Sequence, residues 1–152
     1  SGSAAAVLGS ILAGRGNEAL GHLLQGEMLA ERGDLDGAAR AYVRGARLDD
    51  PRAMHRLGRC YEEGAGRRLR PVRAAYWYEQ AAYHQYAEAQ LDLARCYEHG
   101  LGVPVVPGRA YVLYRKAASA GLVEALPHVA RCEATNFGLP RLLVHGDQSH
   151  GV

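Results

Sequence analysis

Apolar residues in the first third of the chain recur at the spacing of one helix face. Between Glu18 and Arg32 they stand three and four residues apart, at Leu20, Leu23, Leu24, Met28 and Leu29. This is the pattern of an amphipathic helix. Gly33-Asp34 then supplies turn-forming residues, and a second helical pattern runs to about Leu48. The sequence therefore predicts a helix pair here.

A longer version of this helix pair follows twice, with a fixed period. Residues 53–88 and 89–124 align without a gap, and fifteen of the thirty-six columns are identical. The identities include the Arg-Cys-Tyr-Glu runs that begin at Arg59 and Arg95. A period of about twenty to fifty residues is typical of a solenoid, in which each unit buries its apolar face only against its neighbours. The sequence thus predicts an all-α solenoid.

The same pattern sets the expected boundaries. The repeat domain is expected over 18–138, with units at about 18–50, 51–86 and 87–121 and a capping helix at 122–135, where the pattern stops. Residues 1–17 are expected to hold a cloning remnant, Ser1-Gly2-Ser3, and an N-terminal capping helix. Residues 139–152 show no helical pattern and are expected to form an irregular tail.

The repeated columns carry a resemblance to a known family. The pattern Ala-x-x-x-Leu-Gly-x-x-Tyr-x-x-Gly-x-Gly, followed by Ala-x-x-Trp-Tyr-x-x-Ala-Ala, is carried by Ala53, Leu57, Gly58, Tyr61, Gly64, Gly66, Ala74, Trp77, Tyr78, Ala81 and Ala82. It resembles the SEL-1-like repeat (SLR), a longer relative of the tetratricopeptide repeat. The resemblance is specific over 51–121 and partial over 19–50 and 122–138. It implies a right-handed superhelix of antiparallel helix pairs. It also implies a non-enzymatic adaptor that holds partner proteins in a concave groove lined by the first helices.

Helical phase, counted from the apolar positions Ala53, Leu57 and Tyr61, predicts which side chains face this groove. In the two longer units and the capping helix they are Arg52, His55, Arg59, Glu62, Glu88, Leu91, Arg95, Glu98, Glu124, Pro127 and Arg131. In the first unit they are Leu20, Leu23, Glu27 and Ala30.

One groove column consists of arginine. Arg59, Arg95 and Arg131 stand one period apart, and guanidinium groups bind carboxylates through two parallel hydrogen bonds. An acidic peptide or a C-terminal carboxylate is therefore one candidate ligand. The alternative is that each arginine pairs within its own helix, because Glu62 and Glu63 lie three and four residues after Arg59. If the column binds a ligand, replacing Arg59 and Arg95 by Glu should abolish partner capture without unfolding the protein.

A cluster of arginines favours a different class of function, the binding of an anionic ligand. Residues 52–73 hold seven arginines against two glutamates, a local excess of +5 in a chain whose net charge is +2. Four of the arginines, Arg67, Arg68, Arg70 and Arg73, form a candidate basic patch for nucleic acid or anionic lipid. Few aromatic residues are interleaved for base stacking, so nucleic acid is not the favoured partner.

Self-assembly is the third class. The terminal segments AAAVLGSILA and Leu142-Leu143-Val144 are apolar, whereas a solenoid needs polar ends to stay monomeric. A homo-oligomer, in which a terminal segment docks on a neighbouring copy, is therefore an alternative to partner binding.

The remaining chemistry-bearing residues point away from enzymes and metals. Cys60, Cys96 and Cys132 stand one period apart. Equivalent helices pack roughly 8–10 Å apart, which exceeds the reach of a disulfide, so free thiols and a reducing compartment such as the cytoplasm are expected. The histidines lack metal-ligand spacing, and no strand precedes a glycine-rich loop. We expect no catalytic residue, cofactor, metal site or membrane span.

Overall fold

The computed structural model describes residue 4 and residues 15–135, and the structural statements below refer to this part of the chain. The expected N-terminal capping helix falls largely outside the described residues, and so does the expected tail at 139–152. The terminal segments on which the self-assembly hypothesis depends are not described either.

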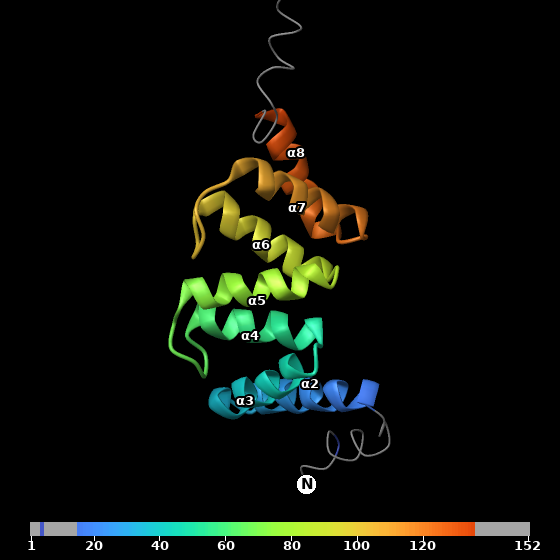
Figure 1. The fold of residues 1–152 in the computed structure, drawn as a ribbon, viewed down its shortest axis with the longest axis vertical. Helices are drawn as coiled ribbons and strands as arrows, with labels where there is room; N and C mark the ends of the chain where they lie inside the picture. Colours follow the sequence, from blue (N-terminus) through green and yellow to red (C-terminus); the bar gives the residue numbers. More distant parts are fainter. Residues whose placement is uncertain (1–3, 5–14, 136–152) are drawn as a thin grey trace, which may run out of the picture.

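The described residues form a stack of helices that follow one another along the long axis of the molecule (Figure 1). The elements are α2 (Arg15–Glu31), α3 (Leu35–Arg47), α4 (Pro51–Glu63), α5 (Pro71–Tyr83), α6 (Ala87–His99), α7 (Pro107–Ser119), a 3-10 turn η1 (Val123–Ala125) and α8 (Leu126–Ala134). The pairs α2/α3, α4/α5 and α6/α7 pack most closely, and each pair also contacts the next. No strand occurs within this stretch, and the prediction of an all-α solenoid is confirmed.

Small residues let the two helices of each unit approach closely. Ala74 and Ala81 on α5 are buried, and a Cβ built on Gly58 of α4 would lie 2.7 Å from the Tyr78 ring. The rings of Tyr78 and Tyr114 are fully enclosed, at 0% exposed. The recurring Ala, Gly and Tyr columns therefore fix the spacing within each unit.

The first glycine of each Gly-x-Gly pair ends a first helix. Gly64 and Gly100 adopt left-handed conformations, with φ of 70° and 71°, directly after α4 and α6. Glycine tolerates this region because it has no Cβ. Each loop then turns back onto its helix, through hydrogen bonds of 2.9 Å from Arg70 N to Tyr61 O and from Val106 N to Tyr97 O.

The second glycine docks the loop on the preceding unit. Gly66 and Gly102 have φ of 71° and 73°. A Cβ on Gly66 would clash with the carbonyl of Leu35 at the start of α3, and a Cβ on Gly102 with the carbonyl of Pro71 at the start of α5. Each Gly-x-Gly loop thus locks one unit onto the one before it.

We predict that Gly102→Ala destabilises the protein more than Gly121→Ala. Both residues have positive φ, but nothing lies within 4 Å of a Cβ at Gly121. Gly121→Ala, the control, should lower the free energy of unfolding only by the cost of a left-handed conformation at a non-glycine residue, about 1–2 kcal/mol. Gly102→Ala should lower it by a further ~1–3 kcal/mol, because the new Cβ is overpacked against backbone. Urea unfolding followed by circular dichroism measures both. Equal losses would show that the loop does not lock the units together.

Candidate functional site on the first helices

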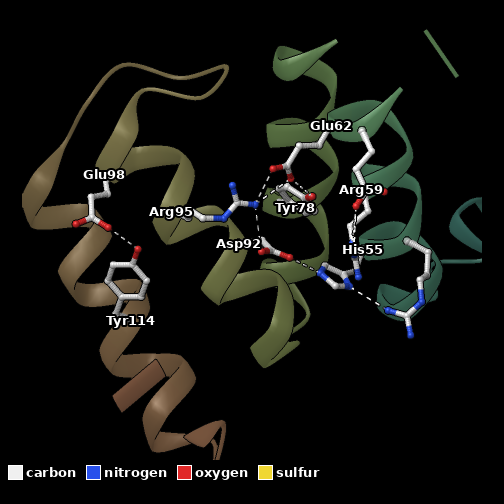
Figure 2. Close-up of polar contacts among 10 residues, drawn as sticks. His55, Arg59, Glu62, Tyr78, Asp92, Arg95, Glu98 and Tyr114 are labelled. Carbon is white, nitrogen blue, oxygen red and sulfur yellow. Dashed lines mark hydrogen bonds and ion pairs between the residues drawn. The ribbon is translucent and has the colours of Figure 1, made fainter. Parts of the chain in front are cut away.

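Side chains of α4 and α6 meet across the boundary between two units. Tyr78, on α5, donates a hydrogen bond from its hydroxyl to Glu62 on α4. Arg95 of α6 binds the same carboxylate, with 2.8 Å between Nη2 and Oε2. Figure 2 shows Glu62 between the tyrosine hydroxyl and the guanidinium group. We call this arrangement the Tyr–Glu–Arg bridge.

The bridge recurs one unit further on. Tyr114 donates to Glu98, with 2.6 Å between the hydroxyl and Oε1 (Figure 2). Arg131 of α8 donates to Glu98 from both terminal nitrogens of its guanidinium group, Nη1 to Oε2 and Nη2 to Oε1, the second at 3.0 Å. Two Tyr–Glu–Arg bridges therefore join three consecutive first helices through side chains that stand 36 residues apart.

Electrostatics keep both tyrosines protonated and the carboxylate of Glu98 charged. The hydrogen bond from Arg131 lowers the pKa of Glu98, against the opposing effect of burial, and Tyr114 adds to the lowering. Burial raises the pKa of Tyr78 and of Tyr114, and the hydrogen bond to the neighbouring carboxylate raises each further. Each tyrosine is thus held as a donor, and Glu98 as a charged acceptor.

His55 does not line the groove, which corrects the expectation from helical phase. It is only 4% exposed and lies between the rings of Tyr78 and Tyr86, with ring centroids 5.6 and 5.5 Å away. Its Nε2 lies 2.6 Å from Asp92 Oδ2 (Figure 2). The position faces the packed flank of α4 rather than solvent. Leu23 of the first unit is likewise buried.

Asp92 is a residue of this region that the sequence reasoning missed. Besides His55 it contacts Arg95, at 3.3 Å between Oδ1 and Nη2. Burial by itself raises the pKa of Asp92, but the hydrogen bond and charge of His55, together with Arg95, outweigh it and lower the pKa. Its spacing of three residues before Arg95 was the available signal.

The arginine column divides into two kinds of residue. Arg95 and Arg131 bind glutamates of the preceding unit, whereas Arg59 pairs within its own helix, with 3.0 Å between Nη2 and Glu63 Oε1. Glu62, expected as a partner of Arg59, binds Arg95 instead. Arg95→Glu would set a carboxylate against Glu62 and Asp92, so the expected Arg59/Arg95 double replacement would disturb the fold.

The other expected groove residues differ in exposure. Arg52 binds Asp50, the N-cap of α4, at 2.9 Å and keeps its side chain 42% exposed. Glu88, Glu124 and Pro127 are exposed, and Leu91 is half-buried against the core. In the first unit the half-buried residues are Leu20, Glu27 and Ala30.

The four arginines of the candidate basic patch differ in their surroundings. Arg68 and Arg70 are exposed in the loop. Arg73 lies over the ring of Tyr61, 5.9 Å from its centroid. Arg67 is half-buried, and its Nε is buried without a hydrogen-bond partner among the described residues. Arg68, Arg70 and Arg73 are therefore exposed, and binding of a polyanion to them stays a prediction.

The cysteines are free and buried, so the prediction of unpaired thiols is confirmed. Burial raises the pKa of Cys60 and Cys96 to about 11, which makes these thiols poor nucleophiles. In the described part of the chain, no group of three or more His, Cys, Asp and Glu side chains could hold a metal ion. None of the helices in that part has the length and apolar character needed to cross a bilayer.

Stacked helix pairs, locked by Gly-x-Gly loops and joined by Tyr–Glu–Arg bridges, define a helical-repeat solenoid. Comparison with protein-family profiles identifies two Sel1 repeats, at residues 51–86 and 87–122. Residues 51–122 are thus two repeats of the Sel1 family, whose members generally serve as protein–protein interaction scaffolds.

Solved structures agree with this assignment. A Sel1 repeat protein from Oxalobacter formigenes is 25% identical with a TM-score of 0.75, and the match covers 81% of this chain and 52% of that one. A protective antigen of uropathogenic Escherichia coli strains displaying an SLR fold is 23% identical with a TM-score of 0.75, covering 81% of this chain and 27% of that one. This chain therefore spans about half and about a quarter of these neighbours. A search of curated proteins finds no match.

We predict that Glu98→Gln destabilises the protein at pH 7 but not in acid. The pKa of Glu98 is lowered in the folded state, so its contribution is complete above the ordinary value of 4.5 and is lost as the pH falls through the folded value. At pH 7 the free energy of unfolding should fall by about 1–2 kcal/mol. Urea unfolding at pH 7 and at pH 3 measures this loss. Glu88→Gln, at an exposed position, is the control. A loss that is no smaller at pH 3 than at pH 7 would contradict a charge-dependent bridge.

Proposed function

We propose that this protein is a non-enzymatic adaptor that holds a partner protein or peptide against the groove side of its first helices. The role of Sel1 repeats as interaction scaffolds supports the general class. What the chain binds must depend on groove side chains that are not already used to join its own units. The Tyr–Glu–Arg bridges remove Glu62, Arg95 and Glu98 from that set.

Arg59 carries the proposal. Its side chain is 53% exposed, and its ion pair is with Glu63 of the same helix. An exposed pair of this kind contributes only about 0.3–0.5 kcal/mol, so Arg59 can exchange it for a better-placed carboxylate of a partner. Arg95 cannot do so without breaking its contacts to Glu62 and Asp92.

A second groove column indicates how charge should be distributed along the partner. Arg52 in the second unit is replaced by the exposed Glu88 and Glu124 in the units that follow. The charge of this column therefore changes from basic at Arg52 to acidic at Glu88 and Glu124. The partner that fits this surface is a segment with acidic residues at one end and basic residues at the other.

We predict that Arg59→Glu lowers partner capture from native extract at least about tenfold, since it replaces an attractive charge by a repulsive one. Arg44→Glu, an equal charge reversal at an exposed position on α3, is the matched control and should leave capture unchanged. Quantitative mass spectrometry of the captured proteins measures the effect, and circular dichroism checks the fold of both variants. Equal capture by Arg59→Glu and the unchanged protein would refute the groove as the binding surface.

A further inference from the structure

The first unit lacks the carboxylate of the Tyr–Glu–Arg bridge. In the first two units a glycine of the first helix faces a tyrosine ring of the second: Gly26 faces Tyr42, and Gly58 faces Tyr78. The separations are 16 and 20 residues, so the first unit is four residues shorter between its helices. Positions on α2 therefore match those on α4 after a shift of 32 residues. By this register the equivalent of Glu62 is Ala30.

The donors of the bridge are nevertheless present. Tyr42 corresponds to Tyr78 and is only 5% exposed. Among the described residues, no group forms a hydrogen bond with its hydroxyl. Arg59 corresponds to Arg95, and its one acceptor in this part of the chain is the exposed Glu63. The boundary between the first two units thus holds the tyrosine and the arginine without the glutamate.

A cavity lies where that glutamate would be. It has a volume of about 200 Å³ and is lined by Ala30, Leu35, Tyr42, Arg59, Cys60 and Ala65, among others. At the next boundary, Glu62 fills the equivalent space, and Leu101 stands where Ala65 stands here. Two smaller side chains, Ala30 and Ala65, therefore stand where the other boundary has Glu62 and Leu101.

We propose that this cavity is a binding site for a carboxylate, and specifically for a glutamate side chain of a partner peptide. The ligand carboxylate would take the place that Glu62 and Glu98 hold in their bridges, accepting hydrogen bonds from the Tyr42 hydroxyl and the Arg59 guanidinium group. This inference rests on the proposed function, and it names the chemical group by which the partner is anchored.

The charges around the cavity accept a further anion. Arg56 and Arg59 are accompanied by Glu27, 3.0 Å from Arg56, and by Glu63. These four side chains sum to zero, so a bound carboxylate brings the local sum to −1. Burial, followed by the charge of Glu27, raises the pKa of Tyr42 to about 12, so its hydroxyl remains a donor at neutral pH.

The first test supplies the missing carboxylate from the chain itself. Ala30→Glu should complete a third Tyr–Glu–Arg bridge and raise Tm by about 3 °C or more, although Ala is the better helix former. Ala30→Gln, which has the same shape without the charge, should not raise Tm. The gain should also vanish when Ala30→Glu is combined with Tyr42→Phe. No gain from Ala30→Glu, or an equal gain from Ala30→Gln, would overturn the proposal.

The second test adds the carboxylate from outside. N-acetylglutamate α-amide, which carries only a side-chain carboxylate, should bind in the millimolar range and shift the backbone NMR signals of residues 56–65. N-acetylglutamine amide, which has no carboxylate, should not bind. N-acetylalanine carries only a terminal carboxylate, so its comparison with the glutamate probe distinguishes a side-chain carboxylate from a C-terminal one. Arg59→Gln should weaken binding of the glutamate probe at least about tenfold, and Ala30→Glu should abolish it. Arg68→Gln, in the exposed loop, should leave it unchanged.

The outcomes separate this site from the proposed function. Binding of the neutral probe, tighter binding of N-acetylalanine than of the glutamate probe, or binding that survives Ala30→Glu would overturn the site. Partner capture could still depend on Arg59 in that case. Conversely, if the unchanged protein captures no partner but binds the glutamate probe as described, the carboxylate site stands and the adaptor function fails.

Discussion

The arrangement of the first two units depends on one tyrosine of the second helix. The rings of Tyr42 and Tyr78 each face a glycine of the first helix, where a Cβ would clash. The ring sets the distance between the two helices and carries its hydroxyl toward the groove side. There, Tyr78 and Tyr114 each hold a glutamate that binds an arginine of the next unit. Packing within a unit and bonding between units are therefore consequences of the same side chain.

This coupling explains why residues on the groove side can be structural. Arg95 and Glu62 are partly exposed and would pass as binding residues by exposure alone, yet they join neighbouring units in the way that nearest-neighbour terms stabilise a solenoid. The Gly-x-Gly loops add a second link, because Gly66 and Gly102 lie against the preceding unit. Specificity is left to positions that neither link uses.

The sequence was sufficient for the features that depend on one unit at a time. The helices, the glycine turns and the free thiols follow from columns that repeat every 36 residues. It was insufficient where a side chain chooses between partners. Glu62 lies three residues after Arg59 and 33 before Arg95. It binds Arg95 because α6 packs beside α4, and this packing cannot be read from the spacing. The prediction that His55 faces the groove was wrong for a related reason. Helical phase gives the direction of a side chain, but it does not show that the ring of Tyr86 covers His55. The role of Ala30 stayed hidden because the shorter first unit breaks the 36-residue register.

The same logic indicates why omission of a side chain is an effective way to make a site in a repeat protein. Tyr42 is already held by its contact with Gly26, so ordering this donor adds no cost to binding, and the main cost is the release of Arg59 from Glu63. A neutral amide could accept from the hydroxyl but would gain little from the guanidinium group, whereas a carboxylate satisfies both donors, as Glu98 does. The selectivity for a carboxylate therefore comes from a scaffold that the chain builds twice with its own glutamates and leaves open once.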